Sequence, residues 1–297
     1  MYEEYVSYVK RHYGQNAIVI FDGYRNAENS TKTMEQKRRA LKVQSVEIMF
    51  TKEMSATTTQ AVFLANSLNK GRFIDGLKKC FIDSHSMVFL EDSDDADNLI
   101  VSTAINTLKN DCVVVGTDTD LLALLIHKCH KDNQVLYHIP GTQTKPDVTY
   151  NITNVQVSLK PMLKKYILFL HAVTGCDTTS ALFRQGKKKI VSVMEKNPTL
   201  YSEIDIFYDK NAFQTDIAKV GEKVILALYG APKKIISLDD LRYRRFLQAS
   251  KRSLQSQVNM ASLPPTSSAA REHSYRVYYQ LQLWLQTPGP VPLSSCE

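Results

Sequence analysis

Six aspartates in four short segments are the residues of this chain best suited to hold a divalent cation. They are Asp22, Asp95, Asp97, Asp118, Asp120 and Asp177. The apolar runs 17–21 and 112–115 each lead into one of these segments. A buried strand that ends in an aspartate places a carboxylate at the carboxyl edge of a sheet, where open α/β sheets bind ligands. Carboxylates that share a crevice repel one another unless a cation joins them. The pattern therefore predicts a metal site built from separated segments.

The most acidic segment, 91–97, contains five acidic residues in seven positions. Helix capping and the helix dipole account for one or two acids at a helix start, but not for five. A calcium loop of the EF-hand type requires glycine at its sixth position and glutamate at its twelfth. Counted from Asp92, those positions hold Asp97 and Thr103, so we set that alternative aside. Metal ligation by Asp95 and Asp97 is the favoured interpretation.

The segment 116–122 carries the most specific motif, a Val-rich run that breaks at glycine and then offers Asp118 and Asp120. Asp120 can simply cap the helix that follows, which leaves Asp118 without a local role and favours a functional one. The two remaining aspartates have structural alternatives. Asp22 precedes a glycine, and a turn explains it equally well. Asp177 lies among small hydroxyl residues that are also typical of a turn.

Hydrophobic periodicity predicts how the chain positions these groups. Strands are expected at 17–21, 86–90 and 111–116, with a hairpin formed by 134–139 and 147–152. Helices are expected at 2–13, 32–43, 56–83, 94–109, 121–127, 162–173, 187–195, 211–229, 237–250 and 268–286. The alternation of strands and helices predicts an α/β fold with three layers, in which helices cover both faces of a central, mainly parallel sheet. The later helices form a C-terminal extension, interrupted by a linker at 251–267.

The charge balance points to an anionic partner. The net charge is +7 and the pI is about 9.0. Basic residues concentrate in two helical stretches, and they are Lys32, Lys37, Arg38, Arg39, Lys187, Lys188 and Lys189. The second stretch follows Gly186, and glycine before a basic helix start suits phosphate binding. A solvated helix face explains the lysine run equally well.

Cysteine usage and hydropathy limit the class of protein. The five cysteines are scattered and form no CxxC pair, which argues against a disulfide scaffold or a cysteine zinc site. His127, Cys129 and His130 lie close together, but a polar helix end is the favoured explanation. No apolar run reaches the roughly 20 residues of a membrane span, and the N-terminus does not read as a signal peptide. We expect a protein of the nucleus or cytoplasm without a membrane partner.

In their order, these segments resemble the flap-endonuclease (XPG-type) branch of the PIN-like metal nucleases. The stretch 19–23 with the basic helix after it is similar to the second acidic motif and gateway helix of that family. Asp95-Ala96-Asp97 and Asp118-Thr119-Asp120 resemble its two paired acidic motifs, and Gly175-Cys176-Asp177 resembles its last metal aspartate. The stretch through Gly186–Lys189 resembles its helix-two-turn-helix. The segments 174–181 and 263–265 narrow the resemblance to a group of animal proteins related to mobile elements.

The resemblance implies a fold, a cofactor and a reaction. It implies a PIN-like core at 1–195 and a helical extension at 196–297. The six aspartates would hold two Mg²⁺ or Mn²⁺ ions, which suit carboxylate ligands and hydrolyse phosphodiesters as a pair. The basic residues of both stretches would hold nucleic acid, with DNA favoured over RNA, by its backbone. The implied activity is structure-specific cleavage.

Two departures from the family keep other functions open. The family fold opens with a strand that ends in a first metal aspartate, and residues 1–16 supply none. The turn 182–186 also has one glycine where the family has two. A nuclease-like protein without catalysis, which binds nucleic acid or a protein, is therefore the alternative. A third possibility is an interaction protein whose aspartates lie far apart.

Overall fold

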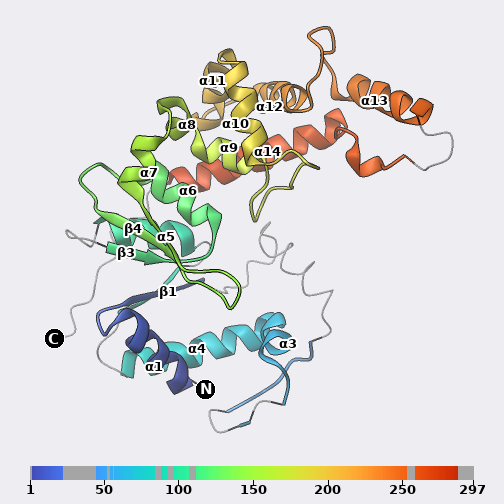
Figure 1. Ribbon diagram of the computed structural model, residues 1–297. Coiled ribbons are helices and arrows are strands. Elements are labelled where there is room, and N and C mark those ends of the chain that lie inside the picture. Colours follow the sequence, from blue (N-terminus) through green and yellow to red (C-terminus); the bar gives the residue numbers. More distant parts are fainter. Residues whose placement is uncertain are drawn as a thin grey trace. The chain divides into compact units, whose positions relative to one another are not determined.

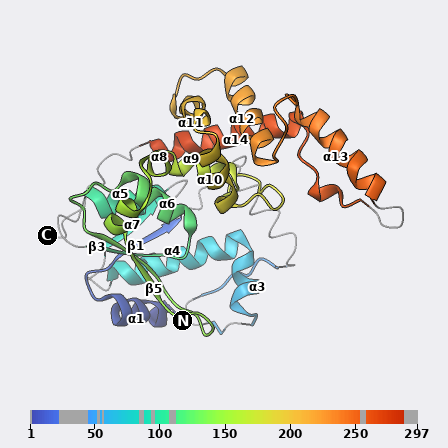
Figure 2. The same cartoon turned by 45° about the horizontal axis from the view of Figure 1, so that its top comes forward.

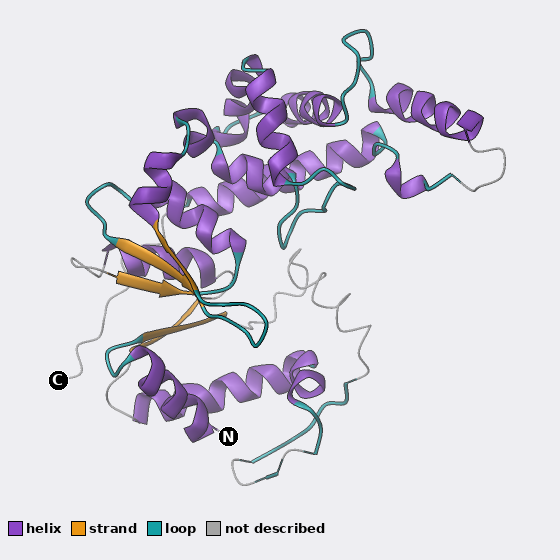
Figure 3. Ribbon diagram, viewed as in Figure 1, coloured by secondary structure: helices purple, strands orange, loops and turns teal. Residues whose placement is uncertain are grey.

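The computed structural model divides the chain into two compact units, residues 1–103 with 288–297 and residues 104–287. It describes residues 2–22, 45–51, 54–55, 57–83, 88–92, 96–106, 112–252 and 258–286. Helices predominate throughout these ranges (Figure 3). Each unit has its own sheet and its own core, so each is described by itself.

Unit 1 pairs two parallel strands and packs two helices on each other. Its elements are α1 (Tyr2–Tyr13), β1 (Ile18–Asp22), α3 (Gln60–Ala65), α4 (Ser67–Asp83), β2 (Val88–Asp92) and the start of α5 (Ala96–Asn106). Helix α1 buries Tyr2 and Val6, one turn apart, against Phe73, Leu77 and Phe81 of α4. In the parallel ladder Ile18 is opposite Val88 and Asp22 is opposite Asp92, so both strands end in a carboxylate.

Unit 2 contains a mixed sheet of three strands in the order β3-β4-β5. The strands are β3 (Cys112–Val115), β4 (Val135–Ile139) and β5 (Val148–Asn151). Strand β4 is parallel to β3 and antiparallel to β5. The hairpin predicted around Gly141 is confirmed, and the Gly141 amide donates to Asp147 Oδ1 at 2.5 Å.

Helices form the larger part of unit 2 (Figure 1). They are α6 (Thr119–Lys128), α7 (Ile152–Ser158), α8 (Pro161–Lys165), α9 (Ile167–Val173), α10 (Lys187–Lys196), α11 (Thr199–Ile204), α12 (Gln214–Leu228), α13 (Leu238–Arg252) and α14 (Ser267–Leu285), with short 3-10 turns at Asp205–Tyr208 and Met260–Ser262. Helix α14 packs against α9 and α12 and buries Val277, Leu281 and Trp284. The close approach of α12 to α14 requires Gly221, because an added Cβ would lie 1.9 Å from Ser274 Oγ.

The prediction of a three-layer α/β fold with a central, mainly parallel sheet is wrong. Within the described ranges the strands form two small sheets, one parallel with two strands and one mixed with three. Most expected strands do form, at 18–22, 88–92 and 112–115. The error lies in their pairing, because an apolar run shows that a strand is buried but does not show which strand lies beside it. Only the antiparallel hairpin had a local signal for its partner.

Two predicted helical segments also differ from the structure. The single helix expected at 162–173 is divided into α8 and α9 at Tyr166, whose hydroxyl donates to Asp205 Oδ1 at 2.7 Å. The helix expected at 32–43 lies outside the described residues. The helices expected at 211–229, 237–250 and 268–286 are confirmed as α12, α13 and α14, with ends that differ by a few residues. The domain boundary expected at 195–196 stays a prediction.

Candidate functional site

The turn between β3 and α6 positions the Asp118–Asp120 pair. Gly116 continues the parallel ladder, with its amide donating to the His138 carbonyl at 3.1 Å. An added Cβ at Gly116 would lie 2.8 Å from Leu121 Cδ2, so a larger residue here would displace the end of the Leu121 side chain. The sheet also holds the backbone at Asp118 in place, because the Tyr137 hydroxyl of β4 donates to the Asp118 carbonyl at 2.7 Å. The apolar strand, the glycine and the buried tyrosine thus fix where α6 begins.

The two aspartates of this motif have different roles. Asp118 is the N-cap of α6, and its Oδ1 accepts the Asp120 amide at 3.0 Å. The sequence had suggested Asp120 as the cap, so the local role belongs to the other residue. The Asp120 carboxylate is buried instead, with Oδ1 2.6 Å from His171 Nε2 of α9.

The Asp120–His171 pair lies inside unit 2. Their side chains are 9% and 5% exposed, respectively. The imidazole also lies against Trp284 of α14, with ring centroids 5.9 Å apart. Three segments that are far apart in the sequence therefore meet at this pair, and it ties α6 to α9 and α14. Sequence analysis missed His171, because a single histidine within an apolar helix carries no spacing signal.

The turn 174–180 brings Asp177 into the electrostatic neighbourhood of Asp118. Gly175 has a φ of +107°, and an added Cβ would lie 2.8 Å from Ala181 Cα, so this turn requires glycine. The Thr179 hydroxyl donates to the Ala172 carbonyl at 2.6 Å, and the Thr178 hydroxyl donates to Gln280 Oε1 at 2.6 Å. The small hydroxyl residues thus hold the turn, and Asp177 is exposed on it.

These carboxylates influence one another's charge. Partial desolvation raises the pKa of the Asp118 carboxyl above its ordinary value, and the charges of Asp120 and Asp177 raise it further. The hydrogen bond from the Asp120 amide and the nearby His171 act in the opposite direction. Although Asp118 as a residue is exposed, its ionised form is therefore less stable than in water. A bound cation would reverse this effect.

The remaining predicted acids lie in unit 1 or outside the described residues. Asp22 ends β1 in unit 1, and Asp97 lies in the first turn of α5, also in unit 1. Asp95 lies outside the described residues, as do Lys32, Lys37, Arg38 and Arg39. The structure thus brings together Asp118, Asp120 and Asp177.

A two-ion centre does not fit the described part of the chain by itself. In the ranges that the structure covers, no group of three or more His, Cys, Asp or Glu side chains has the geometry to hold a metal ion. Of the three clustered carboxylates, Asp120 is bound to His171 and Asp118 uses one oxygen as a helix cap. Asp118 and Asp177 are the two that reach the surface. The predicted Mg²⁺ or Mn²⁺ pair stays a prediction, as do the ligand roles of Asp22, Asp95 and Asp97.

The zinc alternative at the end of α6 gains no support. Burial raises the pKa of the Cys129 thiol to about 12, so the thiol is protonated at neutral pH. Only a thiolate is a good zinc ligand. Burial also lowers the pKa of His127, whose ring lies near Tyr208. A helix end with buried polar groups remains the better explanation.

The lysines predicted to hold phosphate lie beside the Asp177 turn. Lys187, Lys188 and Lys189 form the first turn of α10 and are exposed. The Lys187 ammonium donates to the Gly175 carbonyl at 3.2 Å, which joins this basic turn to the turn that carries Asp177. Gly186 is the N-cap with φ −80°, and an added Cβ would meet nothing within 4 Å. The close backbone approach expected at Gly186 is thus sterically open.

Among the helices that the structure describes, none combines the length and the apolar composition that a bilayer span needs.

Comparisons with other proteins add no assignment to this geometry. The sequence matches no protein-family model, and no curated protein sequence matches it.

Proposed function

We propose that this chain is a nucleic-acid-binding module related to metal-dependent nucleases, and that it contacts phosphates through the first turn of α10. The observation that carries the proposal is the hydrogen bond from Lys187 Nζ to the Gly175 carbonyl. It joins the first turn of α10, which carries three exposed lysines, to the turn of Asp177, whose charge raises the pKa of Asp118. One surface thereby carries both the cationic groups that bind phosphate and the carboxylates that bind cations.

The start of α10 offers further donors to a phosphate. The first N–H groups of a helix have no partner inside the helix, and the helix dipole favours an anion there. No side chain caps this turn of α10. A phosphate oxygen can therefore accept from backbone amides while the lysines neutralise its charge. Contacts of this kind fix position on a backbone without reading its sequence.

Fluorescence anisotropy of a labelled flap DNA in EDTA tests the proposal. The variant Lys187→Ala, Lys188→Ala, Lys189→Ala should bind about tenfold more weakly or worse, and the salt slope of log K should fall by about 2–3. The matched control replaces three other exposed lysines of the same unit, Lys210, Lys233 and Lys234. Equal losses in the two triple variants would show that only the overall charge matters and would refute this surface.

The second candidate is a divalent-metal-dependent nuclease, and the proximity of three carboxylates favours it, since the pKa of Asp118 is raised first by burial and then by the charges of Asp120 and Asp177. Repulsion among carboxylates is a common feature of sites that hold cations. Asp118 and Asp177 would supply the ligands from unit 2, and the cation would polarise a phosphate there. The test is cleavage of flap DNA in Mg²⁺ or Mn²⁺ by the unmodified chain and by Asp118→Asn. Binding without cleavage in either metal would leave the first candidate alone.

A further inference from the structure

Arg184 is the one residue other than glycine that has a positive φ in the described part of the chain. Its φ is +55°. An L-residue in this left-handed region brings its Cβ close to the backbone, so glycine usually occupies such positions. The Gln185 amide donates to the Leu182 carbonyl at 3.0 Å. Arg184 is therefore the third residue of a closed four-residue turn, where a positive φ favours glycine.

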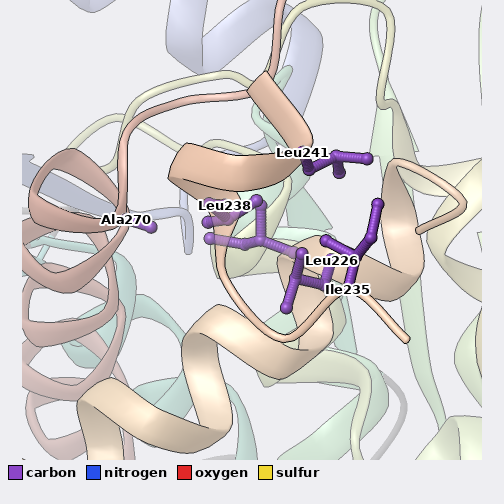
Figure 4. Close-up of a cluster of buried hydrophobic side chains, with 6 residues drawn as sticks. Leu226, Ile235, Leu238, Leu241 and Ala270 are labelled. Carbon is purple, nitrogen blue, oxygen red and sulfur yellow. The ribbon is translucent and has the colours of Figure 1, made fainter. Parts of the chain in front are cut away.

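The residues on either side hold the turn in this conformation. The chain between α9 and α10 projects as a loop from the helices of unit 2 in two views (Figures 1 and 2). Leu182 packs against the buried hydrophobic cluster that α12, α13 and α14 share (Figure 4). Gln185 is buried, and Ile190 and Met194 anchor α10 beyond it. Strain of this kind persists where the surroundings fix the backbone, and it is concentrated at functional sites.

The Arg184 side chain, unlike its neighbours, is presented to solvent in a restricted position. Arg184 is exposed. Its guanidinium lies over the Phe183 ring, 5.2 Å from the centroid. Among the described residues this guanidinium has no hydrogen bond and no ion pair, so its five N–H donors remain for a ligand. Stacking on the ring restricts the side chain, so less conformational entropy is lost when a ligand binds.

Arg184 lies within reach of the phosphate-binding turn of α10. Lys187 follows three residues later, and three residues span at most about 11 Å. The phosphates of one DNA strand recur about every 3.4 Å along the duplex axis. The guanidinium and the lysines can therefore contact phosphates of the same strand. A guanidinium binds a phosphate through two parallel N–H bonds, which an ammonium does not do.

We propose that Arg184 binds a backbone phosphate through its guanidinium fork, and that the chain keeps a strained arginine at this position for nucleic-acid binding. This inference rests on the function proposed for the start of α10 and adds a contact of different geometry to the same surface. Its consequence is a trade-off between stability and binding. The substitution that relaxes the turn is also the one that weakens the grip on nucleic acid.

The test compares Arg184→Gly with the unmodified full chain by thermal unfolding and by fluorescence anisotropy with a flap DNA in EDTA. Because glycine adopts this φ without strain, the thermal midpoint should stay equal or rise. DNA binding should weaken about threefold or more, and the salt slope of log K should fall by about 1. Lys234→Ala, which removes one exposed charge elsewhere in unit 2, is the matched control and should bind as the unmodified chain does.

Arg184→Lys separates the fork from the charge. It keeps the positive charge, so the salt slope should persist while the affinity falls about threefold. Unchanged binding by Arg184→Gly or by Arg184→Lys overturns the proposal, as does a lower thermal midpoint of Arg184→Gly.

The triple lysine variant of α10 keeps the two proposals distinguishable. If it binds weakly while Arg184→Gly binds fully, only the contact of Arg184 fails. Full binding by the triple lysine variant refutes the α10 surface itself, and absence of binding by the unmodified chain refutes both.

Discussion

Asp120 and Asp118 are separated by one residue, but they lie in two different environments of unit 2. Asp120 lies in the buried contact between α6 and α9, whereas Asp118 is exposed at the start of α6. We call the exposed carboxylates Asp118 and Asp177 the rim. In the buried region, Asp120 has one partner, His171, and both are enclosed by apolar helices. On the rim, the charges of Asp177 and Asp120 act on Asp118, and the Lys187 ammonium is hydrogen-bonded to the turn that carries Asp177. The same residue type in one short motif thus pairs with a buried histidine at one position and caps a helix at the surface at the other.

The largest effect is expected from breaking the buried region. Asp120→Leu or His171→Leu leaves the other group of the pair enclosed without its partner, and we expect a loss of about 3–5 kcal/mol in the free energy of unfolding. Urea unfolding can be followed by the fluorescence of Trp284, the single tryptophan, whose ring lies against His171. In the double variant the cost should be smaller than the sum of the two single costs. Additive costs would mean that the two groups do not interact.

The next largest effect is expected from changing the turn 174–180, which carries Asp177. Gly175→Ala places a Cβ 2.8 Å from Ala181 Cα at a φ of +107°, and we expect a loss of about 1–3 kcal/mol. Gly186→Ala is the matched control, because its Cβ meets nothing within 4 Å and its φ is −80°. The control should cost less than about 1 kcal/mol. Similar losses at both glycines would contradict the strained turn.

A smaller effect is expected when a cation is added to the rim. If Asp118 and Asp177 bind Mn²⁺, a concentration ten times the Kd should stabilise the chain by about 1.4 kcal/mol. Thermal unfolding with and without Mn²⁺ measures this gain. The variant Asp118→Asn with Asp177→Asn should lose it, whereas Asp132→Asn with Asp147→Asn, at two exposed acids elsewhere in unit 2, should keep it. An equal gain in both variants would place the cation elsewhere.

The smallest effect concerns the pH dependence of stability. Because the folded-state pKa of Asp118 is raised, the folded chain holds this proton more tightly than the unfolded chain. Stability is then lost as the pH rises from the ordinary aspartate range through the raised pKa. Asp118→Asn should remove this loss, since asparagine also caps helices well. Urea unfolding from pH 3 to pH 7 should show that the free energy of unfolding of the variant increases relative to that of the unmodified chain as the pH rises. A relative increase as the pH falls would contradict the prediction.

The comparison also shows what the sequence was able to predict. The segment 112–120 correctly located β3 and the start of α6. Its apolar run, its glycine and its aspartates each indicate local structure without help from distant residues. The choice between Asp118 and Asp120 as the cap was wrong, since either side chain can reach the first turn and burial by α9 decides. His171 was missed for the same reason, as its partner lies 51 residues away. The sheet pairing failed because parallel partners are selected by packing across the chain.

The most direct test of the account is a map of where nucleic acid touches the protein. Amide chemical shifts of the full chain can be followed by transverse-relaxation-optimised NMR during titration with a flap DNA in EDTA. The account predicts that the largest changes fall on Gly175–Asp177 and Lys187–Lys189, with little change in the buried Asp120–His171 region. Shifts that are confined to α13 or to unit 1, with the α10 start unaffected, would contradict it.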